Sequence, residues 1–280
     1  MKQYVIIITL ISTLLGGSSC KEWLKVDSED RIMEDALFQS ESGFFTALNG
    51  VYVHLLNTNL YGRTLTAGTF DILAQYYDTT KPLNSHTYRS LANFELQAKK
   101  DAVADTWKEA YFLIANINTI LEHCENDRSV LSESNYELIK GECLALRAML
   151  HFEMFRIFGP IYSYEPGKVC IPYSDDTEKN VKPLLSAIDV VDKILTDLNQ
   201  AENLLLNVDP VITKGPQSSA EGNNRLRYRN LRLNYFAVQA LTARVYLYAG
   251  NTTEAGKYAR KVISGASKFF PFATREQVNG

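Results

Sequence analysis

The sequence predicts a mainly all-α fold, an α-solenoid-like stack of helix pairs with long irregular loops. Three observations support this fold class. Successive segments repeat apolar residues with the 3.6-residue period of a helix, and stretches rich in glycine, proline and polar residues separate them. The last two of these segments place small residues where two paired helices must approach closely.

The chain begins with the pattern of a bacterial lipoprotein signal peptide over residues 1–19. A positive residue precedes an apolar run, residues 5–15, that is too short to span a bilayer, and small residues lead to Cys20. Cleavage before Cys20 would leave a lipid-bearing N-terminus. An ordinary secretory signal with an incidental cysteine is the alternative, because Ser18 and Ser19 depart from the usual lipobox.

The mature chain is expected to contain a tether and one helical domain. Residues 20–31 are polar without a helical period, which predicts a lipidated tether, and residues 32–280 form the predicted domain. Its first helix is predicted over residues 33–56, where apolar residues recur at spacings of three, four and seven. Residues 61–103 scatter glycines, a proline and aromatic residues, which predicts a long loop region that is functional or contains short elements.

Later segments predict helices more clearly, and glycine or proline marks the end of two of them. A surface loop rich in glycine, proline, serine, asparagine and arginine is expected over residues 207–228. The helices are predicted over residues 105–125, 132–158, 186–206, 230–249 and 253–264.

The last two predicted helices have the spacing of a tetratricopeptide helix-turn-helix unit. The pattern consists of Ala243, Tyr246, Gly250, Ala255 and Ala259. Because one such pair cannot bury its apolar faces alone, the earlier helices are expected to stack beside it.

Composition and motifs limit the function classes. The formal net charge is -3 and 22% of residues are charged, so a nucleic-acid partner is not expected. The sequence has no motif of nucleophilic hydrolases, zinc proteases or phosphate-binding loops. His123 stands next to Cys124, but adjacent residues point to different faces of a helix, so a metal site is not expected there. We therefore expect a protein without enzymatic activity, metal or cofactor.

The cysteines after Cys20 do not suggest a disulfide framework. They are Cys124, Cys143 and Cys170, an odd number without a C-x-x-C pair. Free thiols buried in helices are favoured, and one disulfide is the alternative.

Several charged or titratable residues admit two interpretations. The acidic run at residues 174–178 offers oxygen ligands for calcium, but a solvated turn is favoured because the run lacks the glycine and terminal glutamate of a calcium loop. Glu142 and Arg147 are expected to fix helix packing through buried hydrogen bonds, and His151 to be a core or groove histidine.

A cluster of arginines stands at the predicted loop-to-helix junction. Capture of a polyanion is one interpretation, and a solvated helix start or a protein contact surface is favoured because the chain is acidic overall. The cluster consists of Arg225, Arg227, Arg229 and Arg232.

Five local patterns, in this order, resemble the RagB/SusD family of outer-membrane nutrient-binding lipoproteins. The first two are Cys20-Lys-Glu-Trp-Leu-Lys-Val-Asp and Ala47-Leu48-Asn49-Gly50-Val51-Tyr52. The third is Trp107-x3-Tyr111-x2-Ile114-x-Asn116-x-Asn118, and the fourth is Glu142-x4-Arg147-Ala148-x2-His151-Phe152-x5-Phe158-Gly159-Pro160-Ile161. The fifth is Ala240-Leu241-Thr242-Ala243-Arg244-Val245-Tyr246-Leu247-Tyr248-x-Gly250.

Two positions of the fourth pattern depart from the family, since His151 replaces a usual tyrosine and Pro160 a usual acidic residue. Family members are usually much longer, so the carboxy-terminal portion of the family is expected to be lacking. A fragment, a truncated gene and a minimal member all remain open.

The resemblance implies an outer-membrane lipoprotein that is anchored by its N-terminal lipid and faces the cell exterior. It implies that the protein binds glycans, oligosaccharides or related nutrients and delivers them to a SusC-like TonB-dependent transporter. A tetratricopeptide-like envelope adaptor that binds a peptide or protein partner is the alternative, because the helix pairs alone equally permit it.

The aromatic loop region holds the candidate ligand-binding residues. Aromatic rings pack against the apolar face of a sugar ring, while amides, carboxylates and arginines bind its hydroxyl groups. The resemblance implies that loops from this part of the fold help to form the ligand site. The alternative is that the aromatic residues close one end of the helical core. The candidates are Tyr76, Tyr77, Asp78, Asn84, His86, Tyr88 and Arg89.

Overall fold

The computed structural model describes residues 29–78, 88–95, 97, 100–218 and 226–279. Contacts divide the chain into two compact units, Met1–Leu37 and Phe38–Gly280. The predicted signal peptide and Cys20 lie outside the described residues. Within the described part of the chain, no helix is both long enough and apolar enough to cross a bilayer.

The single helix predicted over residues 33–56 is wrong, because two helices occupy this segment. Helix α2 (Glu29–Leu37) belongs to the first unit, and α3 (Glu41–His54) belongs to the second. Ser40 has extended backbone and its side chain accepts a hydrogen bond from the Gly43 N–H, so it caps α3 and breaks the helical path. The predicted tether at residues 20–31 also overlaps α2, which already begins at Glu29.

The later predicted helices are all present. They are α6 (Lys100–Asn126), α7 (Glu133–Phe158), α8 (Ala187–Leu205), α10 (Tyr235–Tyr248) and α11 (Thr252–Ala266). The largest differences in where helices start are in α6, which begins five residues before its predicted start, and in α10, which begins five residues after it. Helix α10 starts late because a 3₁₀ turn at Arg229–Leu231 precedes it and Asn234 caps it.

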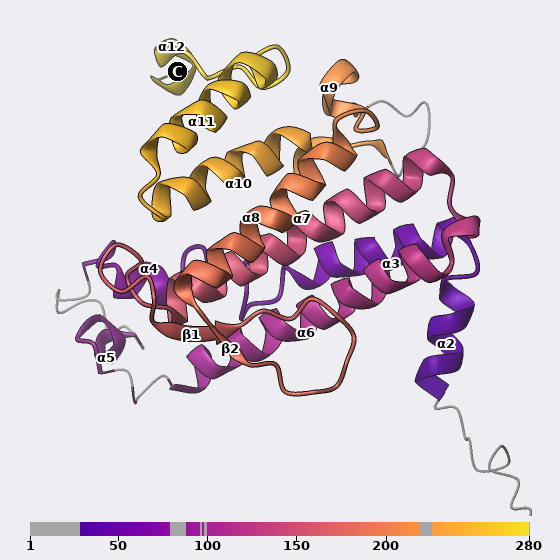
Figure 1. Ribbon diagram of the computed structural model, residues 1–280. Helices are drawn as coiled ribbons and strands as arrows, with labels where there is room; N and C mark the ends of the chain where they lie inside the picture. Colours follow the sequence, from indigo (N-terminus) through magenta and orange to yellow (C-terminus); the bar gives the residue numbers. More distant parts are fainter. Residues whose placement is uncertain (1–28, 79–87, 96, 98–99, 219–225, 280) are drawn as a thin grey trace, which may run out of the picture. The chain divides into compact units, whose positions relative to one another are not determined.

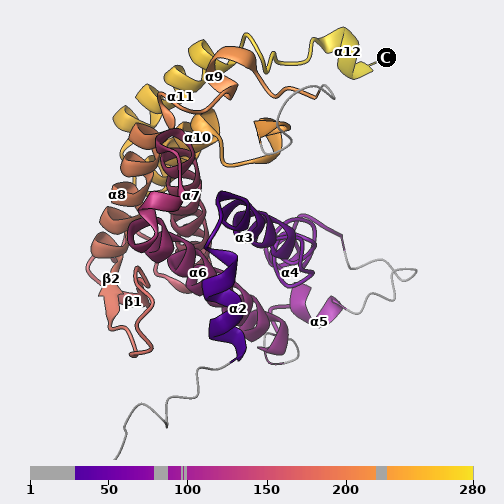
Figure 2. The ribbon, with the colours of Figure 1, turned by 90° about the vertical axis from the view of Figure 1, so that its right-hand side faces the viewer.

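Helix α7 is the centre of the second unit. Figure 1 and Figure 2 show α3, α6, α7 and α8 lying side by side. Along this row α3 contacts α6, α6 contacts α7, and α7 contacts α8. Gly141 lets α8 approach α7 closely, since a Cβ atom at this position would lie 2.8 Å from Cγ of Leu205. Most residues of α7 between Leu138 and Phe155 are buried. Because buried polar groups need partners, its polar side chains in this stretch form hydrogen bonds and ion pairs inside the protein.

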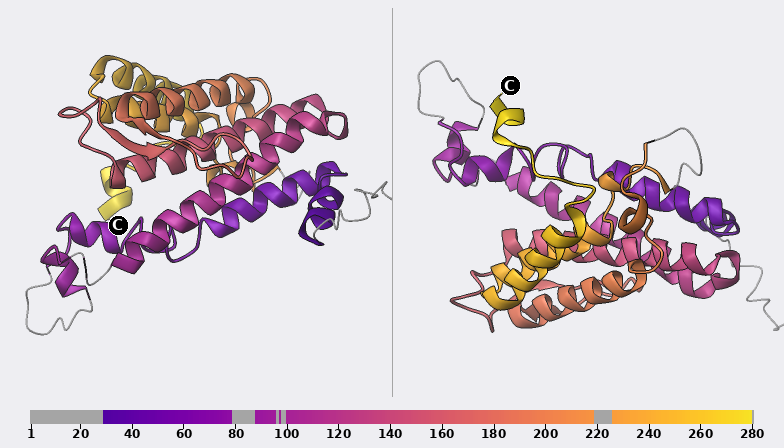
Figure 3. Two further views of the ribbon diagram at one scale, coloured as in Figure 1. Left: turned by 60° about the horizontal axis from the view of Figure 1, so that its bottom comes forward. Right: turned by 90° about the horizontal axis from the view of Figure 1, so that it is seen from above.

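Helices α10 and α11 form the predicted tetratricopeptide-like pair, which contacts α8 through α10 (Figure 3). Gly250 ends α10 with φ at +80°, a backbone conformation that favours glycine. The rings of Tyr246 and Tyr258 then stack across the pair with centroids 5.8 Å apart. The predicted mainly α-helical, solenoid-like fold is confirmed.

Short elements occur in the two predicted loop regions, as α4 (Thr69–Leu73) and α5 (Arg89–Ala92) in residues 61–103 and α9 (Val211–Lys214) in residues 207–228, and also in segments for which the sequence predicted no element. Strands β1 (Val169–Pro172) and β2 (Leu184–Ser186) form an antiparallel hairpin, which contacts α8. The remaining short helices are α12 (Arg275–Asn279) and a 3₁₀ turn at Arg128–Val130.

Candidate functional site

The predicted ligand-binding region contains α4 and α5, which lie near the N-terminal end of α6 (Figure 3). Helices this short are not stable alone, so tertiary packing must hold them. A small apolar cluster joins the two helices and consists of Ile72, Leu73, Tyr88, Leu91 and Ala92.

A side-chain hydrogen bond links the C-terminal ends of α4 and α5. Nε2 of Gln75, directly after α4, donates to the carbonyl oxygen of Ala92 at the end of α5, at 2.9 Å. Gln75 and Phe94 both have left-handed backbone, with φ at +63° and +61°. This conformation is uncommon for residues with side chains and persists where the surrounding structure holds it. The hydrogen bond from Gln75 holds the backbone that follows α4 and α5 in this conformation.

Three aromatic side chains face solvent just beyond these helix ends. Tyr76 is 78% exposed, Tyr77 is 47% exposed and Phe94 is 62% exposed. We call these three residues the aromatic surface. Large exposed rings on a structurally fixed segment are typical of a binding surface.

The structure separates the predicted ligand-binding residues into groups. Asp78 and Arg89 are exposed, like Tyr76 and Tyr77. Tyr88 is half-buried and packs in the apolar cluster, which agrees with the alternative role of closing a core. Asn84 and His86 lie outside the described residues.

Sequence reasoning did not single out Phe94 or Gln75. Phe94 was visible as one of the scattered aromatic residues of the loop region. The role of Gln75 had no sequence signal, because its partner is a backbone carbonyl 17 residues away.

A second polar site lies inside the helical unit, centred on Arg147 of α7. Its Nε and Nη2 atoms donate to the two carboxylate oxygens of Asp197, each at 2.7 Å. Its Nη1 atom donates to Oδ1 of Asn118 at 3.0 Å and to the carbonyl oxygen of Asp175 at 3.1 Å. The hydroxyl of Tyr173 also donates to Asp197, at 2.6 Å. The expected role of Arg147 in buried packing is confirmed.

This network positions the acidic run at residues 174–178. The side-chain amide of Asn118 donates to the carbonyl oxygens of Ser174 and Asp176, at 3.1 and 2.9 Å. Two carboxylates of the acidic run pair with lysine side chains: Asp176 pairs with Lys182, and Asp175 lies 2.6 Å from Nζ of Lys193. The favoured interpretation as a solvated turn is therefore supported, and no group of three or more metal ligands occurs among the described residues.

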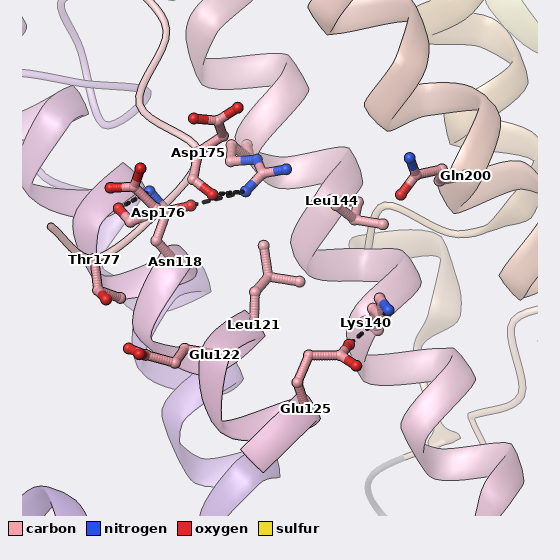
Figure 4. Close-up of a pocket in the computed structure, with 11 residues that line it drawn as sticks. Asn118, Leu121, Glu122, Glu125, Lys140, Leu144, Asp175, Asp176, Thr177 and Gln200 are labelled. Carbon is pink, nitrogen blue, oxygen red and sulfur yellow. Dashed lines mark hydrogen bonds and ion pairs between the residues drawn. The ribbon is translucent and has the colours of Figure 1, made fainter. Parts of the chain in front are cut away.

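A cavity of about 320 Å³ opens between this turn and helices α6, α7 and α8. Figure 4 shows Leu121 and Leu144 pointing into it and the ion pair of Glu125 with Lys140, at 2.6 Å, along one side. Its volume is at the lower end for a small-molecule site, and none of the described residues that line it is aromatic. It is therefore a weaker candidate for sugar binding than the aromatic surface. The remaining lining residues are Asn118, Glu122, Arg147, Asp175, Asp176, Thr177 and Gln200.

For Arg229, the favoured interpretation of the arginine cluster as a solvated helix start or contact surface is wrong, because this side chain is buried. Its side chain is 1% exposed. The Nε and Nη2 atoms donate to the carboxylate of Asp209 at 2.9 and 2.8 Å, and Nη1 donates to Glu142. The hydroxyl of Tyr52 donates to the same Glu142 at 2.6 Å, and burial beside this carboxylate raises the pKa of Tyr52.

The other arginines of the cluster differ from Arg229. Arg232 contacts Asn49 and lies over the ring of Tyr52, with 4.3 Å between Cζ and the ring centroid. Arg227 is half-buried, and Arg225 lies outside the described residues. The cluster is therefore not one solvated surface.

The cysteines and His123 do not form a metal or disulfide site in the described structure. Cys124 and Cys143 are buried free thiols in α6 and α7, as favoured above, whereas Cys170 is a partly exposed free thiol in β1. His123 places Nδ1 2.6 Å from the carboxylate of Asp127 and stacks on Phe38.

Comparisons with known proteins agree with this fold. A family model described as starch-binding and associating with the outer membrane matches residues 22–222. SusD-like protein P25 of Formosa agariphila is 25% identical over 225 residues, which cover 76% of this chain and 40% of that protein. The chain thus spans well under half of this curated relative.

Two solved structures share the fold. A SusD superfamily protein from Bacteroides thetaiotaomicron has a TM-score of 0.66 at 20% identity, over 85% of this chain and 49% of that one. A structure described as a laminarin-binding SusD-like protein has a TM-score of 0.56 at 19% identity, over 80% of this chain and 43% of that one.

Proposed function

The chain belongs to the SusD-like family, described as starch-binding and associating with the outer membrane, and from this premise we propose that it binds glycans there and delivers them to a SusC-like TonB-dependent transporter. The proposed mode is a lipoprotein, anchored through Cys20, that faces the cell exterior. Binding without turnover is the proposed activity. The laminarin-binding relative and the family description make neutral glucans the first ligands to test.

The observation that carries the proposal is the aromatic surface of Tyr76, Tyr77 and Phe94. These rings are exposed, yet the helix ends that present them are fixed by the Gln75 hydrogen bond and the apolar cluster. A preorganised ring loses little conformational freedom when a sugar packs against it, so more of the contact energy contributes to affinity. The exposed Asp78 and Arg89 supply polar groups for hydroxyls on the same segment.

Tyr76→Ala and Tyr77→Ala are each expected to weaken glycan binding about five-fold, or about 1 kcal/mol, because each removes an aromatic face from the ligand. The melting temperature should stay unchanged, since both rings are exposed. Isothermal titration with soluble starch and with laminarin oligosaccharides measures the affinities, and a calorimetric melt measures the stability.

Phe272→Ala is the matched control, because Phe272 is a comparably exposed ring, 82% exposed, in the C-terminal segment. It should leave glycan affinity unchanged. Equal affinities for wild type and both tyrosine variants would contradict the assignment of the aromatic surface.

Cys20→Ser is expected to move the protein from the membrane fraction to the soluble fraction, because the proposed lipid is attached at this sulfur. Cell fractionation of a Gram-negative host expressing the full chain gives the readout. Cys170→Ser, at a partly exposed free thiol, is the control and should leave the protein in the membrane fraction. Membrane association that survives Cys20→Ser would argue against the anchor.

A further inference from the structure

Two arginines on neighbouring helices share one buried carboxylate. Nη1 of Arg156 in α7 donates to Oε2 of Glu153 at 2.6 Å, and Nη2 of Arg244 in α10 donates to Oε1 of Glu153 at 3.4 Å. The Glu153 side chain is only 8% exposed, whereas the side chains of Arg156 and Arg244 are 41% and 54% exposed. Two cations and one carboxylate leave one uncompensated positive charge at the surface of this unit.

Both guanidinium groups are also held against an aromatic ring. Cζ of Arg156 lies 5.9 Å, and Cζ of Arg244 5.6 Å, from the ring centroid of Phe152. Tyr248 packs edge-on against Phe152 and Phe155, with 5.6 Å between centroids in each case. The salt bridges and the ring contacts therefore position both arginines before any ligand arrives.

Most donors of the two arginines remain available. A guanidinium group carries five N–H donors, and the contacts above use one on each arginine. This differs from Arg147 and Arg229, whose side chains are buried and whose donors are bound to internal carboxylates and carbonyls. The exposed pair thus has free capacity for two-pronged contacts with an anion.

Tyr61, which precedes α4 in the chain, lies near these arginines. The hydroxyl of Tyr61 lies within electrostatic range of Glu153, Arg156 and Arg244. Burial raises the pKa of Tyr61, so the hydroxyl stays protonated. Seven residues later, Gly68 precedes the start of α4.

We propose that Arg156 and Arg244 form a subsite for an anionic group, a sulfate ester or a uronate carboxylate, on the bound glycan. This inference rests on the proposed glycan-binding function and narrows its ligand class. Arginine suits both groups, because its planar fork matches two oxygen atoms of a carboxylate or a sulfate. The one net positive charge selects such a glycan over its neutral counterpart.

Matched ligand pairs test the selection with the full chain. Dextran sulfate is compared with dextran, and polygalacturonate is compared with its methyl ester, so that the two members of each pair share a sugar backbone and only one of them carries the anionic group. Wild-type protein is expected to bind at least one charged ligand about ten-fold more tightly than its neutral partner at low salt, and this preference should shrink as salt rises. A preference in the first pair identifies a sulfate, and one in the second identifies a carboxylate.

Arg244→Gln is the main variant, because it leaves the shorter Glu153–Arg156 ion pair in place and so preserves compensation of the buried carboxylate. It should lose most of the charge preference while keeping its melting temperature. Arg156→Lys is the second variant: it keeps the charge, loses the planar fork and should lower the preference less than Arg244→Gln does.

Arg260→Gln, at an exposed arginine of α11, controls for bulk charge and should keep the full preference. The inference is overturned if wild type binds both members of each pair equally, if Arg244→Gln keeps the preference, or if Arg260→Gln loses it to the same extent. Binding of neutral glycans in any of these cases leaves the proposed function standing. Failure to bind neutral and charged glycans alike overturns both proposals.

Discussion

Arg229→Ala is expected to lower the free energy of unfolding by about 3–5 kcal/mol, the usual result of removing one partner from a buried ion pair. The variant leaves the carboxylates of Glu142 and Asp209 buried without their cation, and both side chains are almost fully inaccessible in the folded chain. It also removes the link between α7, the segment before α9 and the turn before α10. Urea unfolding followed by circular dichroism, with wild type and variant at the same pH, measures the change.

Arg232→Ala is the matched control, because Arg232 lies three residues away but contacts the exposed Asn49 and the half-buried ring of Tyr52 and, among the described residues, pairs with no buried carboxylate. It should change the free energy of unfolding by no more than about 1 kcal/mol. A loss for Arg229→Ala as small as that of Arg232→Ala would show that water reaches the two carboxylates in the variant and that the ion pair is not needed to stabilise them.

The triple variant Arg229→Met, Glu142→Gln and Asp209→Asn separates two effects. It removes all three charges together, so no uncompensated ion remains buried, and part of the stability lost in Arg229→Ala should return. If the triple variant is as unstable as Arg229→Ala, shape and hydrogen bonding at this position matter more than charge compensation.

The sequence predicted the long helices well because their evidence is local and repeated. A 3.6-residue period over 20 or more residues, as in α7, tolerates single exceptions, and caps such as Ser186 and glycines such as Gly250 mark the ends. The break between α2 and α3 was missed because apolar spacing continues across it. Ser40 gave a capping signal there, but a serine inside a periodic segment is weak evidence against a continuous helix.

The buried role of Arg229 was beyond sequence reasoning for a different reason. Arg229 stands in a polar, arginine-rich stretch, which is the composition of a solvated loop. Its partners Asp209 and Glu142 lie 20 and 87 residues away, so only the tertiary fold brings the three charges together. The same holds for Arg156 and Arg244, which lie in two separate helices and meet at Glu153.

At the candidate ligand site, the sequence identified the region but not the orientation of each ring. Residues 76–94 lack a period, so no pattern distinguishes a ring that faces solvent from one that packs inward. The structure makes this distinction, because Tyr76 and Tyr77 are exposed whereas Tyr88 packs against Ile72 and Leu91. Substitution of Tyr88 would consequently mix effects on packing with effects on binding.

His151 is expected to make the protein less stable in mild acid, by about 2 kcal/mol between pH 7.5 and pH 5. Its ring is fully buried, Nδ1 lies 2.9 Å from the carbonyl oxygen of Arg147, and Nε2 accepts a hydrogen bond from the Ser174 N–H at 3.0 Å. Nδ1–H therefore donates and Nε2 carries no proton, so the folded ring is neutral. Burial lowers the pKa of His151 to about 3.

The sign follows from the two pKa values. The unfolded chain takes up a proton on this histidine below about pH 6.5, while the folded chain does not do so until about pH 3. Each pH unit below 6.5 therefore favours unfolding by about 1.4 kcal/mol, and the full contribution to stability is present only above pH 6.5.

Urea unfolding at pH 7.5, 6.5 and 5 measures this slope. His151→Gln, which retains a donor and an acceptor but cannot titrate, should show a shallower slope, and the remaining titratable groups cancel in the comparison. Equal slopes for the two proteins would mean that His151 is protonated in the folded state, in which case Nε2 cannot accept from Ser174 and the turn at residues 174–178 must be held by its other contacts, those with Asn118, Arg147, Lys182 and Lys193.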